Sequence, residues 1–184
     1  YLDHAATTPL DKEILEKMLP YFTTDYGNAD SPHALGRKAM AAVDNARDTL
    51  ADLLNAKPNE IYFTSGGTEA DNWAIKATAE AYSSKGKHII TSAIEHHAVL
   101  HTCQYLEKNG FEVTYVNVDE DGVVKLDELE AAIRPDTILV SIMQVNNEIG
   151  ALQPIEAAGA MIKRVNPYTL FHVDAVQGSG KARI

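Results

Sequence analysis

The sequence has a single cysteine, Cys103, among its 184 residues. One cysteine excludes a framework of internal disulfides and is typical of a reducing compartment, so we expect a cytoplasmic protein. No apolar run approaches the roughly 20 residues that a helix needs to cross a bilayer. A membrane is therefore not among the expected partners.

Positive charge is also scarce. The 26 aspartate and glutamate residues outnumber the 16 lysine and arginine residues, which gives a formal net charge of -10. A nucleic-acid-binding protein needs a basic face, so this balance predicts no nucleic-acid partner. It leaves room for a local positive site that binds a small anion.

The remaining composition is that of a globular chain, with 45% hydrophobic and 23% charged residues, enough for one sizeable core. The chain begins with Tyr1 and ends at K-A-R-I, directly after a glycine-rich turn. From these ends we expect a piece of a longer protein.

The hydrophobic pattern alternates between strands and helices along most of the chain. Strands are expected at 60–64, 87–92, 112–118, 137–143 and 170–175. Helices are expected at 11–22, 35–55, 68–82, 96–109, 126–133 and 154–165. Several strand runs are almost continuously apolar, which predicts an α/β fold with a largely parallel sheet flanked by helices.

Ligands of such sheets bind beyond the carboxyl ends of the strands, where this sequence has T-S-G-G-T at 64–68. Gly66 and Gly67 let the backbone come close to a ligand. Thr68 is expected to start a helix, with T-E-A-D as a capping box closed by Asp71. A helix N-terminus favours phosphate, although a tight turn with an ordinary cap is the alternative. No dinucleotide or Walker fingerprint is present.

Histidines follow the next strand, in I-E-H-H-A-V-L-H. His96 is placed to lie flat on an aromatic ligand, or it is an ordinary capping residue. His97 and His101 share a helical face and could hold zinc, but they lack a convincing third ligand. We therefore predict no metal site.

Two later loops add polar groups, Q-V-N-N-E-I-G and H-V-D-A-V-Q-G-S-G. Asp174 ends an apolar strand, so it should be partly buried and in need of a partner. A protonated ring nitrogen of a cofactor would serve, and a helix cap or salt bridge is the alternative. A phosphate site, an imidazole, amides and a carboxylate at one sheet edge together match pyridoxal 5'-phosphate (PLP).

The six motifs Y-L-D-H-A-A-T-T-P, G-N-A-D-S-P-H, F-T-S-G-G-T-E-A-D-N, E-H-H-A-V-L, V-N-N-E-I-G and H-V-D-A-V-Q, in this order, resemble the cysteine desulfurases. These are fold-type I PLP enzymes of the class V aminotransferase family. The resemblance covers essentially the whole chain and corresponds to the N-terminal half of that family. It implies that Gly67 and Thr68 hold the cofactor phosphate. It also implies that His96 stacks on the ring and assists proton transfers.

The resemblance implies three further cofactor contacts. Asn147 would lie on the phenolic-oxygen side, Asp174 would pair with the pyridinium nitrogen, and Gln177 would hydrogen-bond the phenolic oxygen. It also implies that residues 1–15 pack on a small domain, while 16–184 form an incomplete PLP-binding large domain.

Two parts of the family pattern are absent. The Schiff-base lysine belongs to an S-G-H-K stretch that this sequence lacks, and Lys181 does not match it. The persulfide cysteine lies on a later loop, whereas Cys103 falls in the helical run H-T-C-Q-Y-L-E. We therefore expect this chain alone to be inactive and to expose apolar surface where the rest of the protein would pack.

The intact protein is expected to act on L-cysteine as a desulfurase. It would release L-alanine and pass sulfur through a persulfide on its own cysteine to an acceptor such as an iron–sulfur scaffold protein. The family also implies a homodimer. The alternatives are another class V enzyme such as a selenocysteine lyase, or a non-catalytic fragment that acts as a partner or scaffold.

Overall fold

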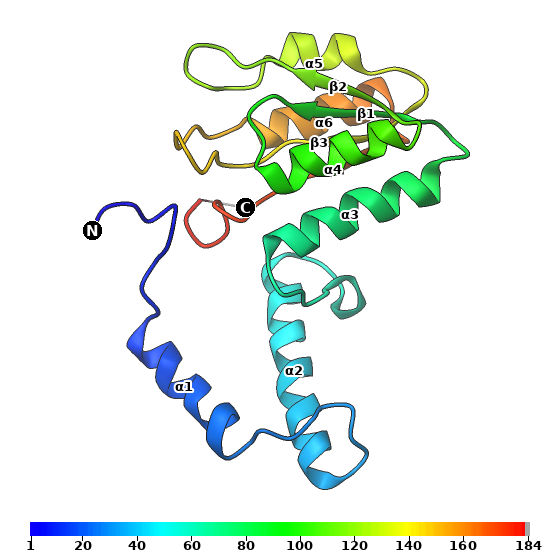
Figure 1. Ribbon diagram of the computed structural model, residues 1–184. Coiled ribbons are helices and arrows are strands. Elements are labelled where there is room, and N and C mark those ends of the chain that lie inside the picture. The colour runs from blue at the N-terminus through cyan, green and yellow to red at the C-terminus, as the bar shows by residue number, and fades with distance from the viewer. Residues whose placement is uncertain (183–184) are drawn as a thin grey trace. The chain divides into compact units, whose positions relative to one another are not determined.

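The computed structural model describes residues 1–182 of the chain, so the last two residues of K-A-R-I lie outside the described residues. The chain forms two compact units, Tyr1–Phe63 and a second unit that begins at Thr64 (Figure 1). The expected division after residue 15 stays a prediction. Within the described residues, no helix combines the length and the apolar character needed to cross a bilayer.

The first unit consists of helices. They are α1 (Lys12–Thr23), α2 (Ala34–Leu53) and the short 3-10 helix η1 (Pro58–Glu60). Asp11 begins α1, because its carboxylate accepts hydrogen bonds from the N–H groups of Glu13 and Ile14. No residue of α1 is buried. Its exposed large apolar side chains are Ile14, Leu15, Met18, Leu19, Tyr21 and Phe22. These side chains give α1 an exposed apolar surface, and whether the rest of the longer protein packs on it stays a prediction.

The strand predicted at 60–64 is wrong. Ile61 does have extended backbone angles, φ -100° and ψ 123°, as its β-branched side chain favours. Within the described residues, however, the segment pairs with no strand of the sheet, and Tyr62 and Phe63 are exposed. Local propensity produces an extended backbone, but a strand also needs a neighbouring ladder of hydrogen bonds.

The second unit contains a four-stranded parallel sheet of order β2-β1-β3-β4. Its strands are β1 (His88–Ser92), β2 (Glu112–Val116), β3 (Thr137–Ser141) and β4 (Leu170–His172). Its helices are α3 (Gly67–Tyr82), α4 (His97–Lys108), α5 (Leu126–Ala132) and α6 (Ile155–Val165). The predicted parallel α/β architecture is confirmed for this unit.

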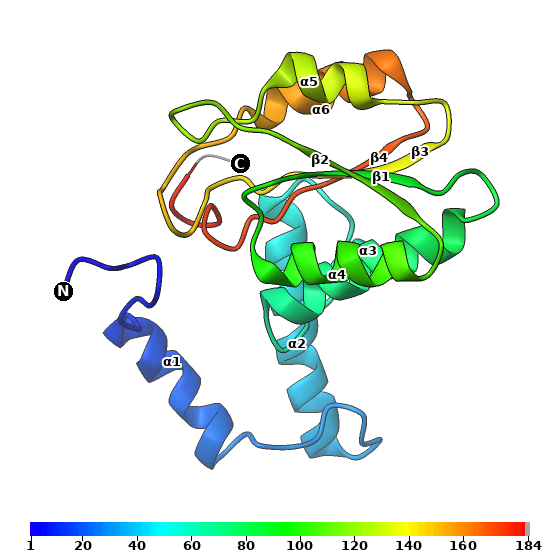
Figure 2. The ribbon, with the colours of Figure 1, turned by 45° about the horizontal axis from the view of Figure 1, so that its top comes forward.

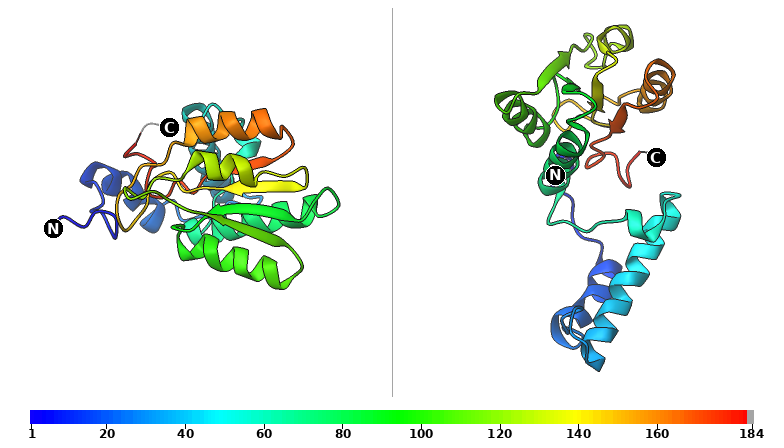
Figure 3. Two further views of the ribbon diagram at one scale, coloured as in Figure 1. Left: turned by 90° about the horizontal axis from the view of Figure 1, so that it is seen from above. Right: turned by 90° about the vertical axis from the view of Figure 1, so that its right-hand side faces the viewer.

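Helices cover both faces of the sheet, with α3 and α4 on one side and α5 and α6 on the other (Figures 2 and 3). Each face has its own core, because successive residues of a buried strand point in opposite directions. Ile89 and Leu139 pack with α3 and α4, while Ile90 and Val140 pack with α5 and α6. All residues of β1 and β3 are buried, which explains the apolar pair Ile89–Ile90 and the apolar run 138–140 at their centres.

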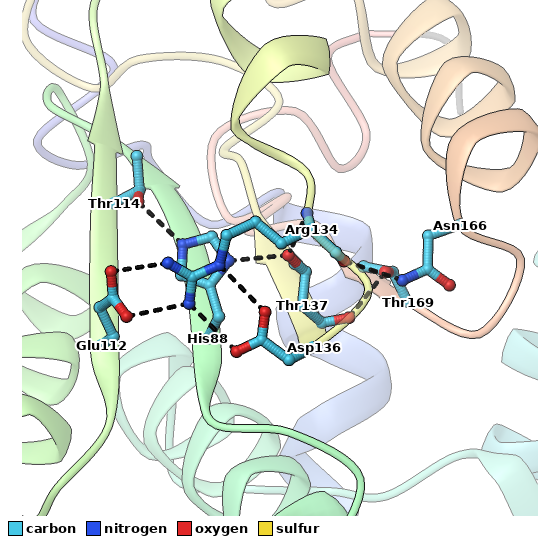
Figure 4. A network of polar contacts seen from close by, with 8 residues as sticks. All are labelled: His88, Glu112, Thr114, Arg134, Asp136, Thr137, Asn166 and Thr169. Carbon is cyan, nitrogen blue, oxygen red and sulfur yellow. Dashed lines mark hydrogen bonds and ion pairs between the residues drawn. The ribbon is translucent and has the colours of Figure 1, made fainter.

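A polar network ties the strands together at their amino ends (Figure 4). The buried imidazole of His88 lies between the hydroxyls of Thr137 (2.7 Å from Nδ1) and Thr114 (2.8 Å from Nε2). Arg134 donates two hydrogen bonds to the carboxylate of Glu112. Burial lowers the pKa of His88, so this histidine serves as a neutral structural group.

Candidate functional site

The turn T-S-G-G-T leads directly into α3, which begins at Gly67 with Gly66 as its N-cap. Within the described residues no side chain caps this helix start. The predicted capping box is wrong, because Asp71 turns inward and is only 4% exposed. The carboxylate of Glu69 instead accepts hydrogen bonds from the N–H and hydroxyl of Ser65. The helix start therefore keeps the open N–H donors that suit a phosphate.

Gly67 lies against the loop that follows β4. A Cβ atom built at Gly67 would be 2.5 Å from Cγ2 of Val176, which is too close for any side chain. The same construction at Gly66 meets nothing within 4 Å. The phosphate-type turn and the loop from Asp174 to Gln177 are therefore immediate neighbours.

Thr68 and His96 line one groove of about 400 Å³ between α3 and α4. His96 is the N-cap of α4, and its Nδ1 accepts a hydrogen bond of 3.1 Å from the N–H of Ala98. This hydrogen bond fixes the imidazole ring at the N-terminus of α4. The predicted shared face of His97 and His101 is confirmed, since their rings stack with centroids 5.0 Å apart.

Asp174 is buried, with 7% exposure, as the sequence predicts. Its Oδ1 accepts a hydrogen bond of 3.0 Å from the N–H of Val176, and its carbonyl accepts one from the N–H of Gln144. Among the described residues no lysine, arginine or histidine forms an ion pair with it. A buried carboxylate without a cation fits a protonated ring nitrogen. Nearby, Oε1 of Gln177 accepts a hydrogen bond from Lys181.

The two amides of V-N-N-E differ in the structure. Asn146 is buried and joins two loops, because its Nδ2 donates to the carbonyl of Ile94 and its Oδ1 accepts from the N–H groups of Glu148 and Ile149. Asn147 is half-buried and its Nδ2 donates to Oε1 of Glu148. The described contacts of Asn147 stay within its own loop, so its part in the site remains a prediction.

Sequence reasoning missed a cluster of buried acids beside Asp174. Asp71 and Glu95 are 4% and 5% exposed. Burial first, and the charge of Asp174 in addition, raise the pKa of Asp71 to about 7. Burial raises the pKa of Glu95 to about 7 against the opposing hydrogen bond from Ser92. The sequence does offer one signal, for His172. It stands two residues before Asp174, and alternate residues of an extended segment face the same side, so the two side chains are expected to be neighbours.

The comparison with known families decides which class of protein this site belongs to. The family described as "Aminotransferase class-V" matches residues 1–184, the whole sequence. The chain belongs to the class-V aminotransferase family. Class-V aminotransferases and the cysteine desulfurases among them depend on PLP, and the open helix start and the cation-free Asp174 fit that cofactor.

Individual class-V relatives are close in sequence and structure. Cysteine desulfurase IscS of Methanosarcina thermophila is 58% identical over 184 residues, which are 100% of this chain and 45% of that protein. The solved structure of a NifS-like protein matches with a TM-score of 0.95 and 48% identity, over 98% of this chain and 50% of the other. SspA in complex with cysteine has a TM-score of 0.88 and 42% identity, over 94% and 49%. The chain thus spans about half the length of these relatives.

Proposed function

We propose that the whole protein is a PLP-dependent cysteine desulfurase, of which this chain supplies much of the cofactor cradle. It would convert L-cysteine to L-alanine and leave the sulfur as a persulfide on a cysteine of the enzyme. The observation that carries the proposal is the 58% identity with a cysteine desulfurase over the full length of this chain. The cysteine bound by SspA, a relative with 42% identity, supports L-cysteine as the substrate.

The chain would hold the cofactor at its phosphate and at its ring nitrogen. The backbone N–H groups of Gly67 and Thr68, at the open start of α3, would bind the phosphate. The buried carboxylate of Asp174 would hold a proton on the ring nitrogen. PLP, when bound, supplies an electron sink for a carbanion, and a protonated ring nitrogen makes that sink stronger.

Other side chains would orient the cofactor ring. His96, fixed as the N-cap of α4, would lie on the ring face and assist proton transfers at the substrate carbon. Gln177 and Asn147 would contact the phenolic-oxygen side, Asn147 with a further contact to the substrate carboxylate. The half-burial of both amides at the carboxyl edge of the sheet supports this arrangement.

The proposal extends to partners and location. Sulfur would pass to an acceptor protein such as an iron–sulfur scaffold, as the resemblance of the six motifs to the cysteine desulfurases implies. A homodimer and a cytoplasmic location complete the proposal. The scarcity of cysteine supports the location, because disulfide-forming compartments favour cysteine-rich chains.

The test is a reaction of the full-length protein, reconstituted with PLP, with L-cysteine. We expect one alanine for each sulfur transferred, and a persulfide on the enzyme that is detectable by mass spectrometry. Preference for L-selenocysteine with little turnover of L-cysteine would favour the lyase alternative. A full-length protein that binds no PLP would contradict the enzyme and favour a scaffold.

A further inference from the structure

Two further buried carboxylates accompany Asp174, the proposed ring-nitrogen partner. Asp71, Glu95 and Asp174 are 4%, 5% and 7% exposed. Burial is the main cause that raises the pKa of Asp71 and of Glu95; the charge of Asp174 raises both further, and the charge of Asp71 adds to the shift of Glu95. No lysine or arginine of the described residues pairs with any of them. Three adjacent anions cannot all remain charged away from water, so protons must be shared among them.

The three acids differ in their hydrogen bonds. Oδ1 of Asp174 accepts a hydrogen bond from the N–H of Val176. Glu95 has one oxygen bonded to Ser92 and to the N–H of Met143, while its Oε2 has no partner among the described residues. A bare buried oxygen disfavours a charge on Glu95. Burial first, and the charge of Asp174 in addition, raise the pKa of Asp71 to about 7, so Asp71, like Glu95, is about half-protonated near pH 7.

Asp71 faces the one basic group of the cluster. Its Oδ1 lies 3.6 Å from Nε2 of His172, and Nδ1 of His172 lies 2.9 Å from Oγ of Ser141. A neutral imidazole carries one N–H and one acceptor nitrogen. With Asp71 protonated, its O–H faces Nε2 and Nδ1–H donates to Ser141. With Asp71 ionised, Nε2–H faces the carboxylate and the hydroxyl of Ser141 donates to Nδ1.

The Asp71–His172 contact also joins the two ends of the cofactor site. Asp71 lies four residues after Gly67 on α3, about one helical turn from the proposed phosphate contact. His172 ends β4 next to Ser141 of β3, two residues before Asp174. The contact therefore holds the start of α3 in place against the strand that carries the ring-nitrogen partner.

We propose that Asp71 and His172, whose Oδ1 and Nε2 atoms meet behind Asp174, are positioning residues that keep Asp174 aligned with the cofactor ring nitrogen. The inference rests on the proposed function, because it assigns a role toward the same cofactor. Asp71 and His172 would act through Asp174, without contact with the reacting atoms.

Because burial raises the pKa of Asp71 to about 7, cofactor binding beside this residue is a proton-linked event. A ring N–H⁺ beside Asp174 offsets the negative charge that helps to raise the pKa of Asp71. The groups that face Asp71 are His172 and Asp174 from β4 and its loop, and Glu95 from the loop after β1. Since the pKa of Asp71 is about 7, binding PLP at pH 7 should release up to about half a proton from this residue.

The experiment measures that proton. PLP is titrated calorimetrically into the full-length apoenzyme at pH 7, in two buffers that differ in ionisation enthalpy. Compared with the unsubstituted enzyme, Asp71→Asn should release about half a proton less per PLP, because an amide cannot titrate. Asp127→Asn, which removes an exposed carboxyl from the first turn of α5, should release the same number as the unsubstituted enzyme.

A second variant separates positioning from folding. His172→Gln keeps a polar contact with Ser141 but removes the imidazole nitrogen that faces Asp71, and its PLP dissociation constant should rise about tenfold, as for one lost buried contact. Equal proton release in Asp71→Asn and the unsubstituted enzyme, or unchanged PLP affinity in His172→Gln, overturns the inference and leaves the desulfurase proposal standing. An unsubstituted enzyme that binds no PLP overturns both.

Discussion

Gly67 and Val176 touch so closely that a Cβ atom on the glycine would lie 2.5 Å from Cγ2 of the valine. The contact joins the first residue of α3 to the loop after β4, two segments that are more than a hundred positions apart in the sequence. It fixes the spacing between the open helix start and Asp174, the two places where a phosphorylated ring compound would be held.

Gly67→Ala should therefore weaken PLP binding. The added methyl must push Val176 away, and a β-branched side chain has few other rotamers, so the Asp174 loop should move with it. We expect the dissociation constant of the full-length enzyme for PLP to rise about tenfold, measured by fluorescence titration.

Two further variants test whether the clash between the added methyl and Val176 causes the loss of PLP affinity. Gly66→Ala adds a methyl where nothing lies within 4 Å, so the alanine itself meets no obstacle there. Gly67→Ala combined with Val176→Ala removes the obstructing group and should recover most of the lost affinity. Failure of the double variant to recover would show that Gly67 matters for a reason other than Val176.

Asp174→Asn should reduce cysteine desulfuration by about 100-fold or more, the loss typical of removing one preorganised electrostatic contact. The amide is similar in size but cannot keep the ring nitrogen protonated. Alanine formation from L-cysteine is the measurement, and the amount of bound PLP is determined in parallel. Near-normal turnover with full PLP occupancy would rule out the charge of Asp174 as a catalytic requirement.

Glu95→Gln should stabilise the protein in a pH-dependent way. Burial raises the pKa of Glu95 to about 7 from the ordinary value of 4.5, so the folded state binds this proton more tightly than the unfolded state. Stability from this group is therefore greatest below about pH 4.5 and is lost as the pH rises to 7. The variant should gain about 2 kcal/mol at pH 8 and much less at pH 5.

Urea unfolding at the two pH values measures this difference. Glu156→Gln, which replaces an exposed carboxyl in the first turn of α6, controls for the loss of one negative charge. An equal gain for Glu95→Gln at pH 5 and pH 8 would mean that Glu95 is not held protonated in the folded protein.

His88→Leu should lower stability by about 2 kcal/mol at pH 7.5, because Thr114 loses its buried hydrogen-bond partner. Burial lowers the pKa of His88, so its favourable contribution is present above the ordinary histidine pKa of 6.5 and is lost as the pH falls below it. The gap between the variant and the unsubstituted protein should therefore narrow at pH 5. A gap independent of pH would contradict a neutral, buried His88.

The sequence predicts the helices and four of the five expected strands because their apolar spacing is a local signal. The segment 60–64 fails, since pairing depends on a neighbour that its own residues do not reveal. The position of Asp174 at the end of an apolar strand is also local, and its burial is predicted correctly.

Local sequence patterns do not predict contacts between residues that are distant in the sequence. Asp71 fits a capping box on spacing alone, and only the fold places it 3.6 Å from His172 of β4. In V-N-N-E the sequence gives two equivalent amides, and the path of the loop buries Asn146 against the carbonyl of Ile94. Residue types predict which chemistry is available, whereas the tertiary fold decides which neighbour each group meets.

The network of Arg134 and His88 lies at the amino ends of the strands (Figure 4). Asp174 instead follows the carboxyl end of β4. A five-residue strand such as β1 is about 16 Å long, roughly twice the screening length of about 8 Å for exposed charges at physiological salt. Engineered charge networks, labels or affinity handles could therefore be introduced around Arg134 with little change in the electric field at the cofactor. We therefore expect charge changes around Arg134 to alter the stability of the protein more than its cofactor site.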